Sequence, residues 1–219
     1  MGMGIDNRMK IAVRAAQEIV PGKIVNLGIG IPSLIPNFVT SKEKVFFQAE
    51  NGILGIAGTP ESGQEDENLC NAGGFPITLR EGGSYFDSAY AFSMIRKGKI
   101  DITVLGALQV SEKGDLANWI VPGKKVPGMG GAMELASCAK KVIVTMNHCN
   151  KNGSSKIVKC CDLPLTASGC VHMIITEMGV FRIVDEQLYL EEIFHPYSVT
   201  DIEMKTDATF NVSETLQFI

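Results

Sequence analysis

The sequence lacks several features that would place it in a class at once. Its 219 residues carry 20 lysines and arginines against 24 aspartates and glutamates, with no basic cluster, so nucleic acid and anionic membranes are poor candidate partners. The N-terminus shows no charged segment followed by an apolar one, which argues against a secretory signal. The least polar stretch, residues 24–39, is interrupted by glycines and prolines and is unsuited to span a membrane. We therefore expect a cytoplasmic protein.

The six cysteines show neither a C-x-x-C pair nor the spacing of a disulfide framework. We expect them to be reduced thiols packed as small apolar side chains. A metal site is conceivable in the acidic segment 61–67, but a solvated surface loop is the better interpretation, and no metal site is predicted.

Familiar catalytic motifs are also missing. The chain has no Gly-x-Ser-x-Gly elbow, no phosphate-binding Walker loop and no His-Glu-x-x-His motif. The three histidines, His148, His172 and His195, are far apart in the sequence, and core or surface positions are the favoured interpretation for each. No general base is evident.

What the chain does contain is an alternation of short apolar runs and helical segments. Runs at 23–27, 45–47, 100–107 and 141–146 predict buried strands, and segments 6–20 and 84–97 predict helices. In the second helix Ser84 and Asp87 have the spacing of a capping box, as do Thr200 and Glu203 before a last helix. The economical fold is one α/β domain over residues 1–219, an open, mostly parallel sheet with helices on both faces.

One carboxylate stands at the end of a predicted strand. Glu50 follows the apolar run 45–47 and precedes the turn signal Asn51-Gly52. The carboxyl ends of strands in an open α/β sheet face the crevice where ligands bind. An isolated Glu beside a turn is more often a solvated loop charge, so its neighbours must decide between the two interpretations.

Two glycine-rich turns and one asparagine are those neighbours. Asn26 is a polar residue inside an apolar run. Gly28 and Gly30 follow it, and their spacing fits a tight structural turn and a ligand-binding loop equally well. The turn at Gly130 and Gly131 precedes a helix, and backbone N–H groups in such a turn are natural oxyanion donors. This set suits nucleophilic carboxylate chemistry better than proton shuttling.

Four ordered stretches resemble the β subunit of family I (3-oxoacid) CoA-transferases, with most similarity to bacterial acetate or butyrate:acetoacetate CoA-transferases. The resemblance spans roughly residues 6–210 and is carried by 25–32 (VNLGIGIP), 47–55 (FQAENGILG), 117–124 (ANWIVPGK) and 128–133 (GMGGAM). Ala49 replaces a serine that is common in the family, and Glu134 replaces a common aspartate.

The resemblance implies a ping-pong mechanism in which Glu50 is the nucleophile and becomes a glutamyl-CoA thioester. It implies that the backbone N–H groups of Gly130 and Gly131 form the oxyanion hole and that Asn26 orients Glu50 or the acyl group. Positions near coenzyme A are then expected at Gly28, Gly30, Asn51 and Met133.

The family's other half, the α subunit, is absent from this sequence. The resemblance therefore implies a separate α chain as partner, in αβ pairs that dimerise further, with acyl-CoA and short-chain carboxylates as substrates. Coenzyme A is expected as substrate and covalent intermediate, with no tightly bound cofactor.

Three alternatives remain open. The first is a non-catalytic, ligand-sensing α/β domain. The second is an acyl-CoA hydrolase in which water replaces the acceptor acid, and the third is an assembly partner of a catalytic α subunit.

Overall fold

The computed structural model describes residues 5–40, 44–123 and 128–219. The helices are α1 (Ile5–Ala16), the 3-10 helix η1 (Pro32–Asn37), α2 (Ser88–Arg96), α3 (Ala132–Cys138) and α4 (Val199–Lys205). The strands are β1 (Ile24–Leu27), β2 (Phe46–Ala49), β3 (Ile53–Gly58), β4 (Thr78–Tyr85), β5 (Ile102–Leu105), β6 (Gln109–Ser111), β7 (Leu116–Ala117), β8 (Lys141–Thr145), β9 (Ile157–Val158), β10 (Met173–Ile175), β11 (Gly179–Val184), β12 (Gln187–Ile193) and β13 (Asn211–Phe218).

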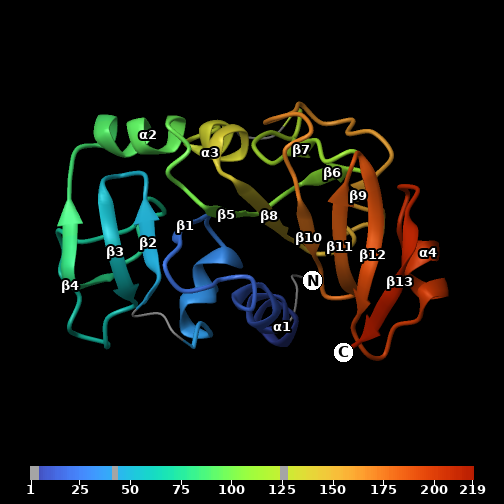
Figure 1. The fold of residues 1–219 in the computed structure, drawn as a ribbon, viewed down its shortest axis with the longest axis horizontal. Coiled ribbons are helices and arrows are strands. Elements are labelled where there is room, and N and C mark those ends of the chain that lie inside the picture. The colour runs from blue at the N-terminus through green and yellow to red at the C-terminus, as the bar shows by residue number, and fades with distance from the viewer. Residues whose placement is uncertain (1–4, 41–43, 124–127) are drawn as a thin grey trace.

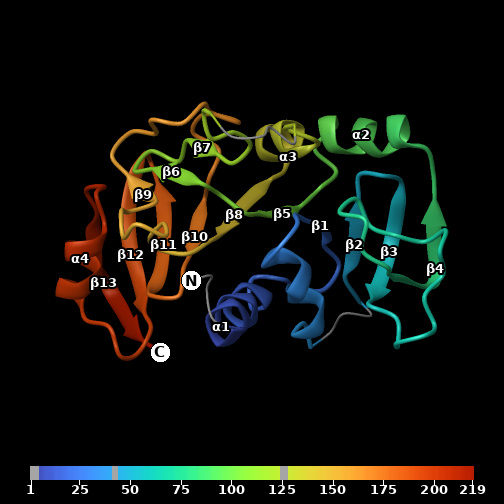
Figure 2. The ribbon, with the colours of Figure 1, turned by 180° about the vertical axis from the view of Figure 1, so that it is seen from behind.

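A ten-stranded sheet crosses the molecule in the order β13-β12-β11-β10-β8-β5-β1-β2-β3-β4. Its central strands β10, β8, β5, β1 and β2 are parallel, and β3, β4, β11 and β12 extend it by antiparallel pairing. Figure 1 shows α2 and α3 above this sheet and α1 and η1 below it, and Figure 2 shows the same layers from behind. The predicted fold class, an open, mostly parallel sheet with helices on both faces, is confirmed. That residues 1–219 form one domain stays a prediction.

The two faces of the sheet bury separate apolar clusters. Val25, Phe47 and Ile102 occupy one register row and face α1. The next row along these strands holds Asn26, Gln48 and Thr103, and side chains alternate between faces. The second row therefore faces α2 and α3, and all three of its polar side chains are buried there.

The strand order places a topological switch point between β1 and β5. The chain leaves β1 toward β2 and leaves the neighbouring β5 toward β8, so the two connections run in opposite directions. Ligands in open α/β sheets bind at such switch points. Gly28, directly after β1, donates its N–H to the Val104 carbonyl at 2.8 Å, which holds the two strands together at this edge.

The N-terminal caps of two helices differ from the sequence prediction. Asp87 itself caps α2 by accepting the Tyr90 N–H at 2.7 Å, because Ser84 is still part of β4. In α4 the capping box is formed by Ser198 and Asp201, two residues before the predicted pair. On α2 the buried residues are Ala91 and Ile95, whereas Tyr90 is exposed.

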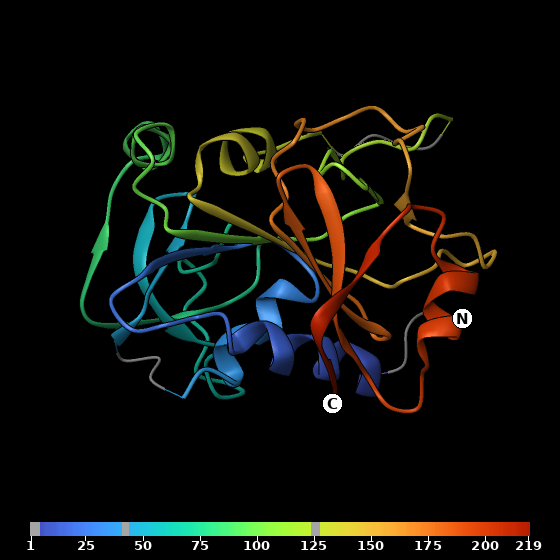
Figure 3. The same ribbon diagram turned by 45° about the vertical axis from the view of Figure 1, so that its right-hand side comes forward.

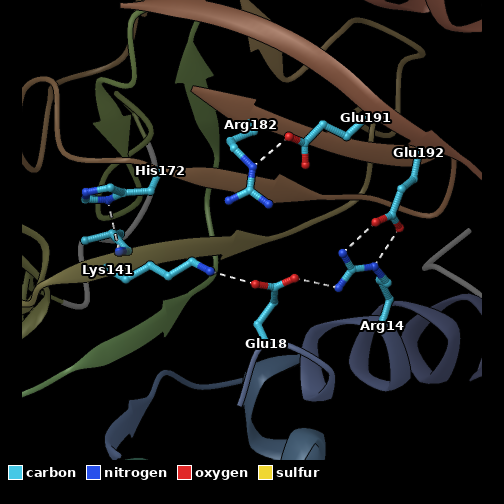
Figure 4. Close-up of polar contacts among 8 residues, drawn as sticks. Arg14, Glu18, Lys141, His172, Arg182, Glu191 and Glu192 are labelled. Carbon is cyan, nitrogen blue, oxygen red and sulfur yellow. Dashed lines mark hydrogen bonds and ion pairs between the residues drawn. The ribbon is translucent and has the colours of Figure 1, made fainter. Parts of the chain in front are cut away.

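Ion pairs fasten α1 to the sheet. Arg14 makes a two-pronged contact with Glu192 on β12 at 2.6 and 2.7 Å, and Glu18 joins Arg14 to Lys141 on β8 (Figure 4). Burial opposes the charge of Arg14, but its carboxylate partners outweigh this and hold its pKa above the ordinary value. Figure 3 shows α1 beneath the sheet, next to the C-terminal end of the chain. No helix in the described segments is long and apolar enough to cross a membrane.

Candidate functional site

Glu50 lies where the analysis of the sequence placed it, immediately after β2. The chain turns sharply behind it, because the Gly52 N–H donates to the Ala49 carbonyl at 3.0 Å. Glu50 is half-buried and its carboxylate accepts a hydrogen bond from a buried side chain, so it is not a fully solvated loop charge.

Asn26 is the polar partner of Glu50. It lies on β1, the parallel neighbour of β2, and is completely buried. Its Nδ2 donates to Glu50 Oε2 at 3.1 Å. This hydrogen bond fixes the position of one carboxylate oxygen of Glu50 at the end of β2.

Gly131 closes the other side of Glu50. A Cβ added at Gly131 would lie 3.3 Å from Glu50 Cγ and 3.3 Å from Phe92 Cζ. These contacts would be tighter than usual for a Cβ, so the absence of a side chain at Gly131 lets the turn lie close to Glu50 without crowding. Gly130 adopts φ +57°, and no atom lies within 4 Å of the position a Cβ would take, so this part of the turn is open. The structure thus brings Glu50, Asn26 and the Gly130-Gly131 turn together.

The residues expected near coenzyme A are more scattered. Gly28 is explained by strand packing, since a Cβ there would lie 3.2 Å from the Val104 carbonyl oxygen. Gly30 is open with φ +97°, and Met133 is 47% exposed in the first turn of α3. The Asn51 side chain donates to the Cys70 carbonyl at 2.8 Å and so fastens the loop that follows β3. Their contact with coenzyme A stays a prediction. Lys124, the last residue of the third motif, lies outside the described residues.

Two residues at the site were missed. Phe92 on α2 lies beside Gly131, with its Cζ 3.3 Å from the position a Gly131 Cβ would take, and no local sequence pattern indicates that proximity. Gln48 on β2 is 2% exposed and accepts a hydrogen bond from Asn26 Nδ2 at 2.7 Å. A polar residue within an apolar strand was the signal that identified Asn26, and the same signal marks Gln48.

Histidines and cysteines take no part in this site. In the described segments, no group of three or more His, Cys, Asp or Glu side chains is arranged to hold a metal ion. The expectation that the cysteines are packed inside holds for Cys170 and is wrong for Cys70 and Cys160, which are exposed.

His148 is buried between two threonines after β8. The Thr176 hydroxyl donates to the Gly179 carbonyl, so it accepts from His148 Nδ1 at 3.1 Å, and Nε2 is left to accept from Thr206 at 2.9 Å. Burial, assisted by the Lys205 charge, lowers the pKa of His148 to about 4. Protonation would place a second donor against the Thr206 hydroxyl and a charge in the core.

We predict that this histidine destabilises the protein in acid. The unfolded chain takes up the proton at about pH 6.5 and the folded chain near pH 4. The contribution of neutral His148 to the free energy of unfolding is therefore fully present above pH 6.5 and decreases as the pH falls from 6.5 to 4. The loss reaches about 3 kcal/mol by pH 4. Urea titrations from pH 7 to about 4 measure it, and His148→Gln should remove that part of the slope. The same change at the exposed His195 is the control, and an unaltered slope in His148→Gln would refute the assignment.

Fold and geometry together define an α/β protein with a hydrogen-bonded Asn26–Glu50 pair at the carboxyl edge of its sheet. The family model described as Coenzyme A transferase matches residues 8–202, and the chain belongs to this family. The predicted enzyme class, CoA-transferase, is confirmed.

Named relatives agree with the resemblance found in the sequence. The chain is 56% identical over 212 residues to a probable coenzyme A transferase subunit beta of Bacillus subtilis, covering 97% of this chain and 98% of the relative. It is 47% identical over 212 residues to the acetate CoA-transferase subunit beta of Escherichia coli K12, covering 97% of both chains. An acyl-CoA transferase of E. coli O157:H7 shares the fold with a TM-score of 0.80 at 21% identity. That match covers the whole of this chain but 44% of the longer one.

Proposed function

We propose that this chain is the β subunit of a CoA-transferase that moves coenzyme A between an acyl-CoA and a short-chain carboxylic or 3-oxo acid. The observation that carries the proposal is the position of Glu50, enclosed by Asn26 and Gly131 at the carboxyl edge of the sheet. The substrate class follows the relatives, among them the acetate CoA-transferase subunit beta of E. coli.

In the first step the Glu50 carboxylate attacks the thioester carbonyl of the acyl-CoA. The C–S bond breaks, the CoA thiolate leaves, and an acyl-glutamyl anhydride forms. The thiolate then attacks the glutamyl carbonyl and releases the first carboxylate, which leaves Glu50 as a glutamyl-CoA thioester. An acceptor carboxylate takes the coenzyme A by the reverse sequence, and Glu50 is regenerated as a carboxylate.

The surroundings of Glu50 support this chemistry. Each tetrahedral step develops an oxyanion, and the backbone N–H groups of Gly130 and Gly131 would be its donors, each contributing about 3–4 kcal/mol. The intermediates hydrolyse readily, so water must be kept away from Glu50; Gly131 lies against its side chain, and Phe92 lies on the other side of Gly131's Cβ position. Gly28, Gly30, Asn51 and Met133 are proposed to lie along the path of the coenzyme A chain.

A separate α subunit would complete the site, in αβ pairs that associate further. Two observations support this. The two relatives named above are themselves subunits, and this chain spans 44% of the longer acyl-CoA transferase. Coenzyme A enters as a substrate and becomes a covalent intermediate.

Covalent trapping tests the proposal. We expect that the chain, co-expressed with its α partner and mixed with acetoacetyl-CoA, is modified at Glu50, and that borohydride or hydroxylamine captures the adduct for peptide mapping. The chain alone should show no turnover. Modification at any other residue, or an active preparation without a modified peptide, would exclude the mechanism. An adduct that reacts with water as fast as with acids would indicate the hydrolase.

A further inference from the structure

The Asn26 side-chain nitrogen is the common point of three contacts. Asn26 Nδ2 lies 2.7 Å from Gln48 Oε1, 3.2 Å from the Gln48 carbonyl oxygen and 3.1 Å from Glu50 Oε2. An amide nitrogen carries two hydrogens, so three acceptors compete for two donors. The short contact to Gln48 Oε1 takes one hydrogen. The other is shared between the Gln48 carbonyl and Glu50.

This arrangement fixes which end of each amide points where. A turned Asn26 amide would place its oxygen against three oxygen acceptors, and a turned Gln48 amide would place its nitrogen against Asn26 Nδ2. Both alternatives lose hydrogen bonds and add repulsion. Gln48 Oε1 therefore holds the Asn26 amide with its N–H toward Glu50.

The protein retains this orientation at a cost. Asn26 is 0% and Gln48 2% exposed, so water does not compete for either group. Asn26 Oδ1 and Gln48 Nε2 find no hydrogen-bond partner within the described part of the chain. Buried polar atoms without partners are rare and unfavourable.

We propose that Gln48 is a positioning residue of the CoA transfer, an inference that rests on the function proposed above. Its side-chain oxygen keeps one Asn26 N–H available to be shared between Glu50 and the Gln48 carbonyl. While Glu50 is a carboxylate, the shared N–H makes a charge-assisted hydrogen bond to Oε2. When Glu50 is acylated and loses its charge, the N–H turns to the Gln48 carbonyl. The Asn26 amide thus stabilises the nucleophile and still has a hydrogen-bond acceptor when Glu50 is acylated.

Two substitutions of similar size separate this role from simple packing. Gln48→Met removes the acceptor, and we expect the glutamyl-CoA adduct to form about 10-fold more slowly, with KM for acyl-CoA little changed. Gln48→Glu keeps an acceptor oxygen but adds a charge close to Glu50. Its rate should approach that of the parent at high pH, while the acid limb of the pH–rate profile moves up by about one unit.

The measurement is single-turnover adduct formation by the αβ complex between roughly pH 5 and 8, together with thermal unfolding of each variant. The control is Gln17→Glu, the same change at an exposed side chain after α1. A folded Gln48→Met complex with the rate and pH profile of the parent would overturn the inference, as would a loss of thermal stability without a change in rate. Because a buried carboxylate sometimes prevents folding, the Met variant decides if the Glu variant is not obtained. If the parent complex itself forms no adduct at Glu50, the proposed function fails, which is a different result from an unaffected variant.

Discussion

Glu50→Asp is expected to abolish CoA transfer, with a loss of roughly 10⁴-fold or more in the rate. The shorter side chain withdraws the carboxylate by about 1.5 Å from Asn26 Nδ2 and from the thioester carbonyl, and misplacement on this scale costs at least about 100-fold by itself. Attack by water is then the surviving reaction, so slow hydrolysis of acyl-CoA should equal or exceed the remaining transfer. The assay measures both activities in the same αβ complex.

Glu50→Ala and Glu61→Gln complete the Glu50 experiment. The alanine variant should still bind acyl-CoA but form no adduct, whereas Glu61, an exposed carboxylate in the loop after β3, should be dispensable. If Glu50→Ala retained transfer, Glu50 would not be the nucleophile. A parent protein that binds acyl-CoA with neither adduct nor turnover would favour the ligand-sensing alternative.

Gly52→Ala is expected to destabilise the protein by about 3–5 kcal/mol. Gly52 has φ +117°, and a Cβ at this position would overlap the carbonyl oxygen of Phe86. Two backbone hydrogen bonds hold the residue in place, from its N–H to Ala49 and from the Phe86 N–H to its carbonyl, each at 3.0 Å. The turn has no room to relax without moving Glu50, so activity should be lost along with stability.

The matched control for this turn is Gly63→Ala. Gly63 also has a left-handed conformation, φ +84°, but nothing lies within 4 Å of its added Cβ. We expect a cost of about 1–2 kcal/mol there, from conformation alone. Denaturant unfolding of both variants compares the two values. Equal losses would show that the Phe86 carbonyl does not restrict Gly52.

The parts of the site that could be predicted from the sequence are those that follow from strand ends. Glu50 and Asn26 each lie at or near the end of a short apolar run, and neighbouring parallel strands bring their carboxyl ends to the same edge. Gly131 was found through its motif, although it lies 81 positions after Glu50 in the sequence. Phe92 was not predictable, because only the packing of α2 above the sheet brings it to Gly131.

Helix faces and caps were harder to assign than the helices themselves. In α1 the apolar residues Met9 and Val13 recur at helical spacing yet are both 43% exposed, while Ile11 and Ala15 are completely buried. Two apolar stripes compete on this short helix, and only the contact with the sheet selects one. In α4 several polar residues precede the helix, and the backbone position of Ser198 decides which of them is the cap. Strand β13 was missed because its sequence alternates without a buried face, and it forms by pairing with β12.

The pairing of Asn26 with Gln48 has a consequence for how substitutions in the core act on catalysis. Side chains alternate along a strand, so a slip of β2 by one residue against β1 would turn Gln48 toward α1 and Phe47 toward α2. What opposes that slip is the burial of Phe47 and its neighbours beneath the sheet. The choice of side chains on the apolar face is thereby constrained by the chemistry on the opposite face. A substitution at Phe47 that loosens the register would impair catalysis, although Phe47 lies on the far side of the sheet from Asn26 and Gln48.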